Sequence, residues 1–141
     1  MALVDGEHIQ LVWDRARACT AQARSGVTIT IGSNDGWTPE QLLVAAAESS
    51  LMTVFLRLAD DANLRVLGYV SSAGAMLDPD TAFPPSIVVR PCIVVGREED
   101  TEAARRLITT ALETSPAARA LREVLRVDAD VIVVEPASNG L

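Results

Sequence analysis

The sequence contains no lysine and only one histidine, and both absences exclude chemistry. A Schiff base, a covalent pyridoxal phosphate linkage and the phosphate-binding lysine of a P-loop all require a lysine amine. The single histidine, His8, leaves little scope for a metal centre. We therefore expect no metal site and no cofactor.

Positive charge and cysteine are also scarce. The formal net charge is -7 at pH 7, from 12 basic and 19 acidic residues, and the arginines form no concentrated basic stretch. A nucleic acid is therefore not expected as a partner. Two cysteines, Cys19 and Cys92, are too few for a disulfide-rich secreted scaffold, and we interpret them as unreactive thiols within strands.

No segment has the pattern of a targeting signal or a membrane span. The N-terminus does not combine a basic segment with a long apolar one, and Glu48 and Arg57 interrupt the longest apolar region. We therefore expect no signal peptide, no spanning helix, no membrane partner and a cytoplasmic location. The length of 141 residues, with 49% hydrophobic and 22% charged residues, favours one folded domain over residues 1–141.

The N-terminal part of the chain predicts strands followed by a helix. Residues 7–13 alternate in the period-two pattern of a half-buried strand, and residues 18–32 predict two more strands around a turn at Ser25 and Gly26. The helix over residues 39–59 begins with Thr38 as N-cap, Pro39 at the first position and Gln41 completing a capping box. Its apolar residues cover every face, which predicts a buried central helix enclosed by other layers.

The rest of the chain alternates strands and helices. Asn63 is the turn residue before the next strand, and Gly74 within that strand is a candidate bulge. Pro91 indicates that the following strand lies at a sheet edge or contains a bulge. The predicted elements are strands over 64–76 and 86–96, a helix from Asp100 or Thr101 to 113, a helix over 116–125 and a strand over 128–135.

This order of elements, together with two local motifs, resembles the OsmC/Ohr family of thiol-dependent peroxidases. PEQLL opens the first helix at Pro39, and TSPAARAL places Ser115 directly before Pro116. The resemblance covers roughly residues 38–135. It implies an α+β fold of the OsmC type, with antiparallel sheets around a long buried central helix and two chains intertwined in a homodimer.

The resemblance also places serine where the family has its reactive cysteines. The first family cysteine lies eleven positions after the proline of PEQL, which is Ser50 here, and the second directly precedes a proline, which is Ser115 here. A histidine often found three residues before the second cysteine is Leu112. A thiol with a reference pKa of about 8.5 forms a thiolate that attacks peroxide and is recycled through a disulfide, and serine does neither. The resemblance therefore implies that the peroxidase cycle is absent.

Three charged residues join the candidate site. Glu40 matches the family glutamate that holds an arginine near the reactive thiol, and Arg24 in the N-terminal hairpin is the candidate arginine. Ten residues of helix separate Glu40 from Ser50 by roughly 15 Å, so they share a site only through a bend or a partner subunit. Glu48 lies in the apolar helix, where an unpaired carboxylate is costly, so it must find an arginine, reach solvent or sit at a subunit contact.

Structural roles compete with each functional one. Ser49 and Ser50 can bond to the helix carbonyl four residues back, Ser115 is a favourable N-cap, and Glu40 suits the first helical turn. His8 is the only histidine base available to a serine hydrolase, and no GxSxG motif surrounds either candidate serine.

Three functions remain open. The favoured one is a family member without peroxidase activity that binds a small, largely apolar ligand in a pocket at the dimer interface. The second is an enzyme that retains hydroperoxide-reducing or hydrolytic chemistry through another residue. The third is a purely structural or partner-binding dimer in which the site has closed. The candidate ligand contacts are Ser50, Glu40, Ser115, Arg24 and Glu48.

Overall fold

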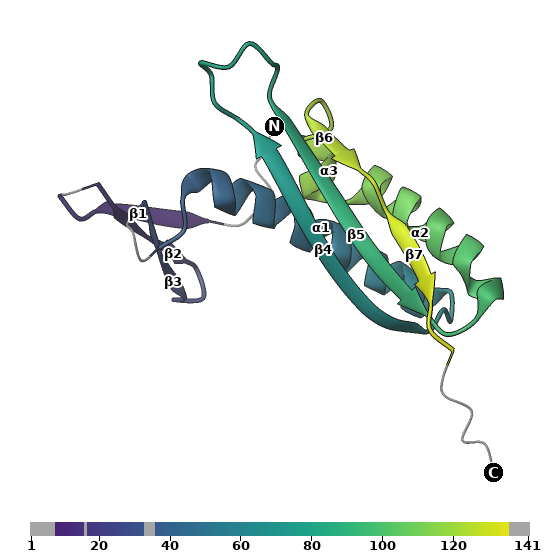
Figure 1. Ribbon diagram of the computed structural model, residues 1–141. Coiled ribbons are helices and arrows are strands. Elements are labelled where there is room, and N and C mark those ends of the chain that lie inside the picture. Colours follow the sequence, from purple (N-terminus) through teal and green to yellow (C-terminus); the bar gives the residue numbers. More distant parts are fainter. Residues whose placement is uncertain (1–7, 16, 33–35, 136–141) are drawn as a thin grey trace, which may run out of the picture. The chain divides into compact units, whose positions relative to one another are not determined.

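The computed structural model describes residues 8–15, 17–32 and 36–135, and the chain divides into two compact units, Met1–Leu43 and Val44–Leu141 (Figure 1). The single domain over residues 1–141 stays a prediction. Glu7, the first residue of the first predicted strand, lies outside the described residues, as does the N-terminal segment tested for a signal peptide.

The first unit contains a three-stranded antiparallel sheet in the order β1-β2-β3. The predicted turn at Ser25 and Gly26 is confirmed, because the Gly26 N–H donates to the Ala23 carbonyl at 2.9 Å. Gly26 has φ +93°, a conformation that side chains disfavour. The strands are β1 (Ile9–Trp13), β2 (Cys19–Ala23) and β3 (Thr28–Ile31).

Strand β1 is present as predicted, but its expected half-burial is wrong within this chain. Ile9, Leu11 and Trp13 are 54%, 62% and 64% exposed, and Val12 on the other face is 57% exposed. The alternation of apolar residues specifies a strand, whereas burial depends on a covering layer.

Helix α1 (Pro39–Asp61) begins at the predicted capping box. The Thr38 N–H donates to Gln41 Oε1 at 2.9 Å, and the Gln41 N–H donates to Thr38 Oγ1 at 3.1 Å. The helix runs two residues beyond the predicted end at Ala59. Asn63, with φ 56°, is the turn residue that follows, as predicted.

The second unit contains a mixed sheet in which β5 is central. Strand β4 pairs with β5 in antiparallel fashion, whereas β6 and β7 are both parallel to β5. The predicted antiparallel pairing is present in the first unit and between β4 and β5, and the parallel β6 and β7 make the sheet of the second unit mixed. A helical crossover follows β5, and such a crossover allows the returning strands to run parallel to it. The strands are β4 (Val66–Met76), β5 (Ser86–Val95), β6 (Leu125–Val127) and β7 (Asp130–Val133).

The bulge predicted at Gly74 and the sheet edge or bulge predicted at Pro91 are both wrong. Gly74 pairs with Val88 in regular register, and the register shift of β4 lies instead between Val66 and Gly68. Pro91 lies in the central strand and pairs with Ser71 without a bulge.

The surroundings of β5 explain why Pro91 is tolerated. The Ile87 N–H donates to the Val124 carbonyl on the β6 side, and because N–H groups alternate along a strand, the Pro91 nitrogen faces the same side. There the pairing with β6 ends at Val89, and the pairing with β7 begins at Cys92. The missing proline N–H thus falls between two partner strands.

The crossover contains the 3-10 helix η1 (Glu98–Asp100), α2 (Thr101–Thr114) and α3 (Pro116–Ala120). The start of α2 is confirmed. The helix predicted over residues 116–125 is wrong beyond Ala120, because Leu125 begins β6 and pairs with Ile87. Pairing with a buried central strand prevails over the local preference for helix.

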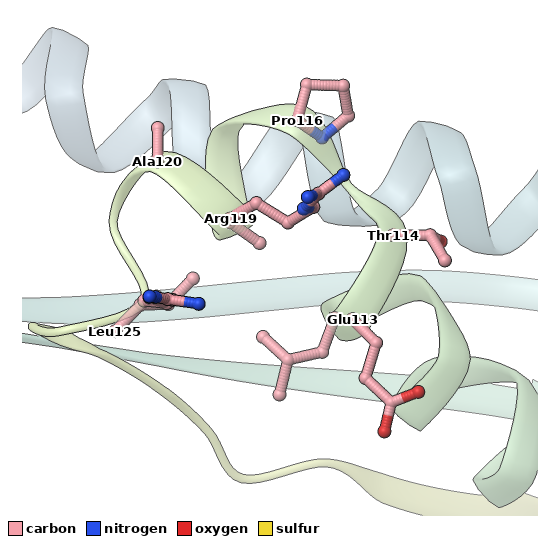
Figure 2. Close-up of a pocket in the computed structure, with 9 residues that line it drawn as sticks. Glu113, Thr114, Pro116, Arg119, Ala120 and Leu125 are labelled. Carbon is pink, nitrogen blue, oxygen red and sulfur yellow. The ribbon is translucent and has the colours of Figure 1, made fainter.

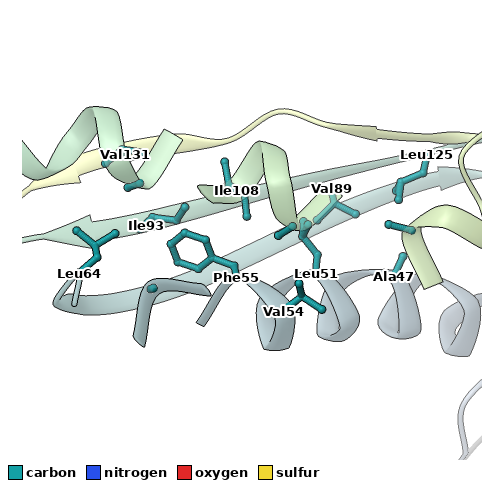
Figure 3. Packing of buried hydrophobic residues seen from close by; sticks show 14 of the residues in the cluster. Ala47, Leu51, Val54, Phe55, Leu64, Val89, Ile93, Ile108, Leu125 and Val131 are labelled. Carbon is teal, nitrogen blue, oxygen red and sulfur yellow. The ribbon is translucent and has the colours of Figure 1, made fainter. Parts of the chain in front are cut away.

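Helices α1, α2 and α3 pack against the sheet to form one hydrophobic core (Figure 3). Alternate residues of β5 face this core, with Ile87, Val89, Ile93 and Val95 completely buried. Helix α1 contributes Ala47, Leu51, Val54, Phe55 and Ala59.

The single chain does not cover α1 on every face, and its enclosure by the sheets of two chains stays a prediction. Leu43 and Leu56 are 39% and 37% exposed. By length and composition α1 could cross a membrane, so the expectation that Glu48 and Arg57 exclude a span is too strict. A core helix meets the same criterion, which makes this weak evidence for a membrane. The exposed leucines show parts of α1 that the chain itself leaves uncovered.

Candidate functional site

The structure brings together the two serines that the sequence singled out. Ser50 lies in the middle of α1, and Ser115 lies at the junction of α2 and α3. Their hydroxyl oxygens are 2.5 Å apart and share a hydrogen bond, although 65 positions separate the residues in sequence. The core packing of α1 against the α2–α3 layer therefore places both hydroxyls at one point.

Ser115 also joins the two helices of the crossover. Its N–H donates to the Ala111 carbonyl at 2.8 Å and ends α2. Ser115 is extended, with φ -64° and ψ 127°, and is the N-cap of α3. Its Oγ accepts a hydrogen bond from the Ala118 N–H at 3.4 Å. The predicted N-cap is confirmed, and Ser115 is completely buried.

The Ser50 hydroxyl bonds to Ser115 and not to a carbonyl of its own helix, which was the structural alternative considered for it. Ser49 Oγ donates back along α1 to the Ala46 carbonyl at 3.4 Å, whereas the Ser50 hydroxyl turns to Ser115. Ser50 is half-buried, so it lies between the buried Ser115 and the accessible surface of the chain.

A second polar cluster lies between α1 and β4. Glu48 is half-buried and accepts a hydrogen bond from the Ser71 hydroxyl. Of the three alternatives considered for it, an arginine, solvent or a subunit contact, the described residues show partial access to solvent. Tyr69 lies two residues before Ser71 on the same face of β4, and its ring is 5.7 Å from that of Phe55. Among the described residues, the buried Tyr69 hydroxyl has no hydrogen-bond partner.

The electrostatics of this cluster favour neutral tyrosine. Burial first, and the negative charge of Glu48 second, raise the pKa of Tyr69 to about 12. Sequence analysis missed Tyr69 and Ser71. Their only local signal was two polar groups on the inward face of an apolar strand, because their partner comes from a different element.

The other candidate residues belong to the first unit. Glu40 lies exposed in the first turn of α1, where the helix dipole favours a carboxylate. Arg24 directly follows β2, and it and His8 are exposed. Their contribution to a site with Ser50 stays a prediction.

Both cysteines are free thiols within strands, as expected. Cys19 pairs with Trp13 in the first unit, and Cys92 lies on β5 between the core-facing Pro91 and Ile93. Neither cysteine lies at the Ser50 or Ser115 position. Among the described residues, no group of three His, Cys, Asp or Glu side chains is placed to hold a metal ion.

Cavities lie elsewhere on the second unit. One of about 790 Å³ follows the α2–α3 junction, and another of about 230 Å³ follows α2. Leu112 lines both. Thr114 and Pro116 line the larger cavity, whereas Ser115 between them faces the interior. Sequence analysis missed this surface, because it forms only where α2, α3 and β6 converge.

The fold is similar to that of several solved structures. An OsmC-like protein of unknown function from Vibrio cholerae matches with TM-score 0.77 and 22% identity, over 92% of this chain and 100% of that one. An OsmC-like protein from Mycoplasma pneumoniae matches with TM-score 0.78 and 15% identity, over 94% and 100%. The organic hydroperoxide resistance protein OhrB of Bacillus subtilis matches with TM-score 0.65 and 20% identity, over 93% and 100%. These similarities define an α+β protein with the OsmC-like fold.

The model of the OsmC-like protein family matches residues 32–130, which is most of the chain. The protein therefore belongs to the OsmC-like family, as the PEQLL and TSPAARAL motifs indicated. No curated protein matches the chain.

Proposed function

We propose that this protein is a non-redox member of the OsmC-like family, in which Ser50 and Ser115 take the positions of the two reactive cysteines. The observation that carries the proposal is the 2.5 Å hydrogen bond between their hydroxyls. Two positions chosen from separate sequence motifs meet within bonding distance, as the two ends of a redox pair must.

The chemistry of serine supports the loss of peroxidase activity. Reduction of a hydroperoxide by this route requires a thiolate that is oxidised to sulfenic acid and then captured by a second thiol. A serine hydroxyl is scarcely ionised at neutral pH and forms no disulfide. Resistance to organic hydroperoxides, which names the Bacillus subtilis relative, is therefore not the activity that we propose here.

The proposed function is binding of a small, largely apolar ligand at the interface of a homodimer. The exposed leucines of α1, Leu43 and Leu56, support a subunit contact along this helix. Half-buried Ser50 and Glu48 supply polar groups beside it, with Glu40 and Arg24 as the proposed remaining contacts. Ser115 holds Ser50 in place from the buried side.

A structural dimer is the second candidate. The complete burial of Ser115 favours it, because the hydroxyl pair already satisfies itself without a ligand. Native mass spectrometry separates the two candidates. A dimer that carries a small non-covalent adduct supports ligand binding, whereas a bare dimer under gentle ionisation supports the structural role.

The peroxidase assay tests the loss of redox function. With a dithiol reductant, the purified protein should consume cumene hydroperoxide no faster than the same mixture without protein. Turnover that disappears in Cys19→Ser or Cys92→Ser would overturn the proposal, because it would show that catalysis uses a thiol outside the serine pair.

A further inference from the structure

Two cavities of about 790 Å³ and 230 Å³ lie along α2 and α3 on the second unit and meet at Leu112, which lines both. We call them together the α2–α3 groove. Its larger part includes Arg119 and Leu125, and its smaller part includes Arg105 and Ile108. Neither Ser50 nor Ser115 lines it, so it is separate from the serine pair.

The floor of the groove is apolar. Ile108, Ala118 and Leu125 are at most 8% exposed and belong to the hydrophobic core. Leu112 is half-buried and packs against the same core. Ile108 and Leu112 are one helical turn apart on the same face of α2, so the apolar floor runs along this helix.

The charged residues that line the groove are mainly basic, whereas the whole chain is acidic. Arg105, Arg119 and Arg122 line it together with one acidic residue, Glu113, although acidic residues outnumber basic ones by 19 to 12 in the sequence. Within the described part of the chain, none of these three guanidinium groups has an ion-pair partner. Arginine keeps its charge at every accessible pH. The groove is thus a locally cationic surface on an acidic protein.

The arrangement of the rim limits the negative charge that it can accept. Figure 2 shows Arg119 on the α3 side of the groove and Glu113 on the α2 side, with the Glu113 carboxylate pointing away from the Arg119 guanidinium. A single carboxylate can approach Arg119 as a bidentate partner, whereas Glu113 disfavours a second negative charge nearby.

We propose that the α2–α3 groove binds a small amphiphilic carboxylate. The alkyl chain lies over Ile108, Leu112 and Leu125, and the carboxylate contacts Arg119 and Arg122. The volume of the larger part is in the range of sites for small molecules. The site needs no redox chemistry and does not rest on the function proposed for Ser50.

Decanoate is the probe, measured by isothermal titration calorimetry and by amide chemical shifts of the full-length protein. Binding should perturb amides over residues 105–125 and weaken as salt is added. Decanol, with a similar chain but no charge, and butyrate, with the charge but little chain, should both bind at least roughly tenfold more weakly.

Matched variants test which arginines bind the carboxylate. Arg119→Gln with Arg122→Gln should weaken decanoate binding roughly tenfold, the loss expected for a charge-assisted hydrogen bond. Arg106→Gln, an exposed arginine of α2 outside both cavities, should leave binding unchanged.

Three outcomes would contradict the site. Equal affinity for decanoate and decanol would remove the role of the arginines. Shift changes centred on Glu48 and Ser50 would place the ligand at the serine pair instead, which would support the proposed function but not this groove. Conversion of a dimer to a monomer by the double arginine variant would show that a second copy of the chain covers the groove.

Discussion

Ser115 makes hydrogen bonds at the ends of two helices and a third hydrogen bond to the Ser50 side chain. Its N–H ends α2 on the Ala111 carbonyl, and its Oγ both caps α3 and contacts Ser50. Because Ser115 is completely buried, each of these hydrogen bonds forms away from water, where an unpaired polar group is costly. The position is therefore held by structure as much as by any function.

The first prediction at this scale tests the geometry of the pair. The double substitution Ser50→Cys and Ser115→Cys, made in a Cys19→Ser, Cys92→Ser background, should form an intrachain disulfide on oxidation. The hydroxyl oxygens are already 2.5 Å apart, and cysteine is close to serine in size. The bond is detected as a two-hydrogen mass loss after free thiols are blocked.

The matched control moves one thiol to the neighbouring helix position. Ser49 is exposed and its hydroxyl bonds along α1, so Ser49→Cys with Ser115→Cys should stay reduced. If the Ser50 pair failed to link in a correctly folded protein, these two positions could not have served as a redox pair.

The second prediction concerns Tyr69, the only tyrosine of the chain. Absorbance at the tyrosinate wavelength should therefore report this residue alone, with a midpoint near pH 12 in the folded protein and near pH 10 after denaturation. The folded state holds the proton more tightly, so this contribution to stability is complete below pH 10 and is lost as the pH rises through 12.

Two variants separate the causes of this shift. Glu48→Gln should lower the folded midpoint only partly, because burial is the larger cause and the Glu48 charge the smaller one. Glu102→Gln, on the exposed side of α2, should have no effect. A folded protein that titrates near pH 10 would contradict the buried environment of Tyr69.

Residue types alone could predict part of this site. Ser50 and Ser115 were identifiable because each sits in a motif with a proline as its reference point. Tyr69 and Ser71 were not, because their chemistry depends on the packing of β4 against Glu48, which no local pattern encodes.

At the scale of elements, the sequence predicted the strands and helices better than their partners. The capping box predicted the start of α1, and the strands predicted over 64–76 and 86–96 correspond to β4 and β5. Parallel pairing was not predictable from the strand residues themselves. It depends on the α2–α3 crossover, which returns the chain beside β5 in the same direction.

Pro91 shows why a local rule can mislead. Proline argues against a central strand because it lacks a donor, yet β5 is central. The rule fails here because one flank of β5 is shared by β6 and β7, with a break opposite the proline. Similarly, Val124 and Leu125 extend an apolar helical pattern, but the chain leaves the helix there. The Val124 carbonyl accepts a hydrogen bond from the Ile87 N–H, and Leu125 pairs with Ile87 as the first residue of β6.

At the scale of the molecule, large apolar side chains remain exposed on both described units. Leu11 and Trp13 of β1 are more than 60% exposed in the first unit, and Leu43 and Leu56 of α1 are more than a third exposed. Soluble monomers rarely leave extensive apolar surface uncovered. The all-round apolar pattern of α1 was thus a correct observation whose covering layer this chain alone does not supply.

The last prediction is that the protein is a homodimer in dilute solution. Light scattering should give a mass near twice the 15.0 kDa of the chain. Leu56→Glu should weaken the dimer by at least roughly tenfold, because it would place an unpaired carboxylate in the proposed contact. Thr110→Glu, on the exposed side of α2, introduces the same charge and should leave the mass unchanged. A monomeric wild-type protein would remove the interface on which the proposed ligand pocket depends. The Ser50–Ser115 bond would be unaffected by that result, because one chain supplies both hydroxyls.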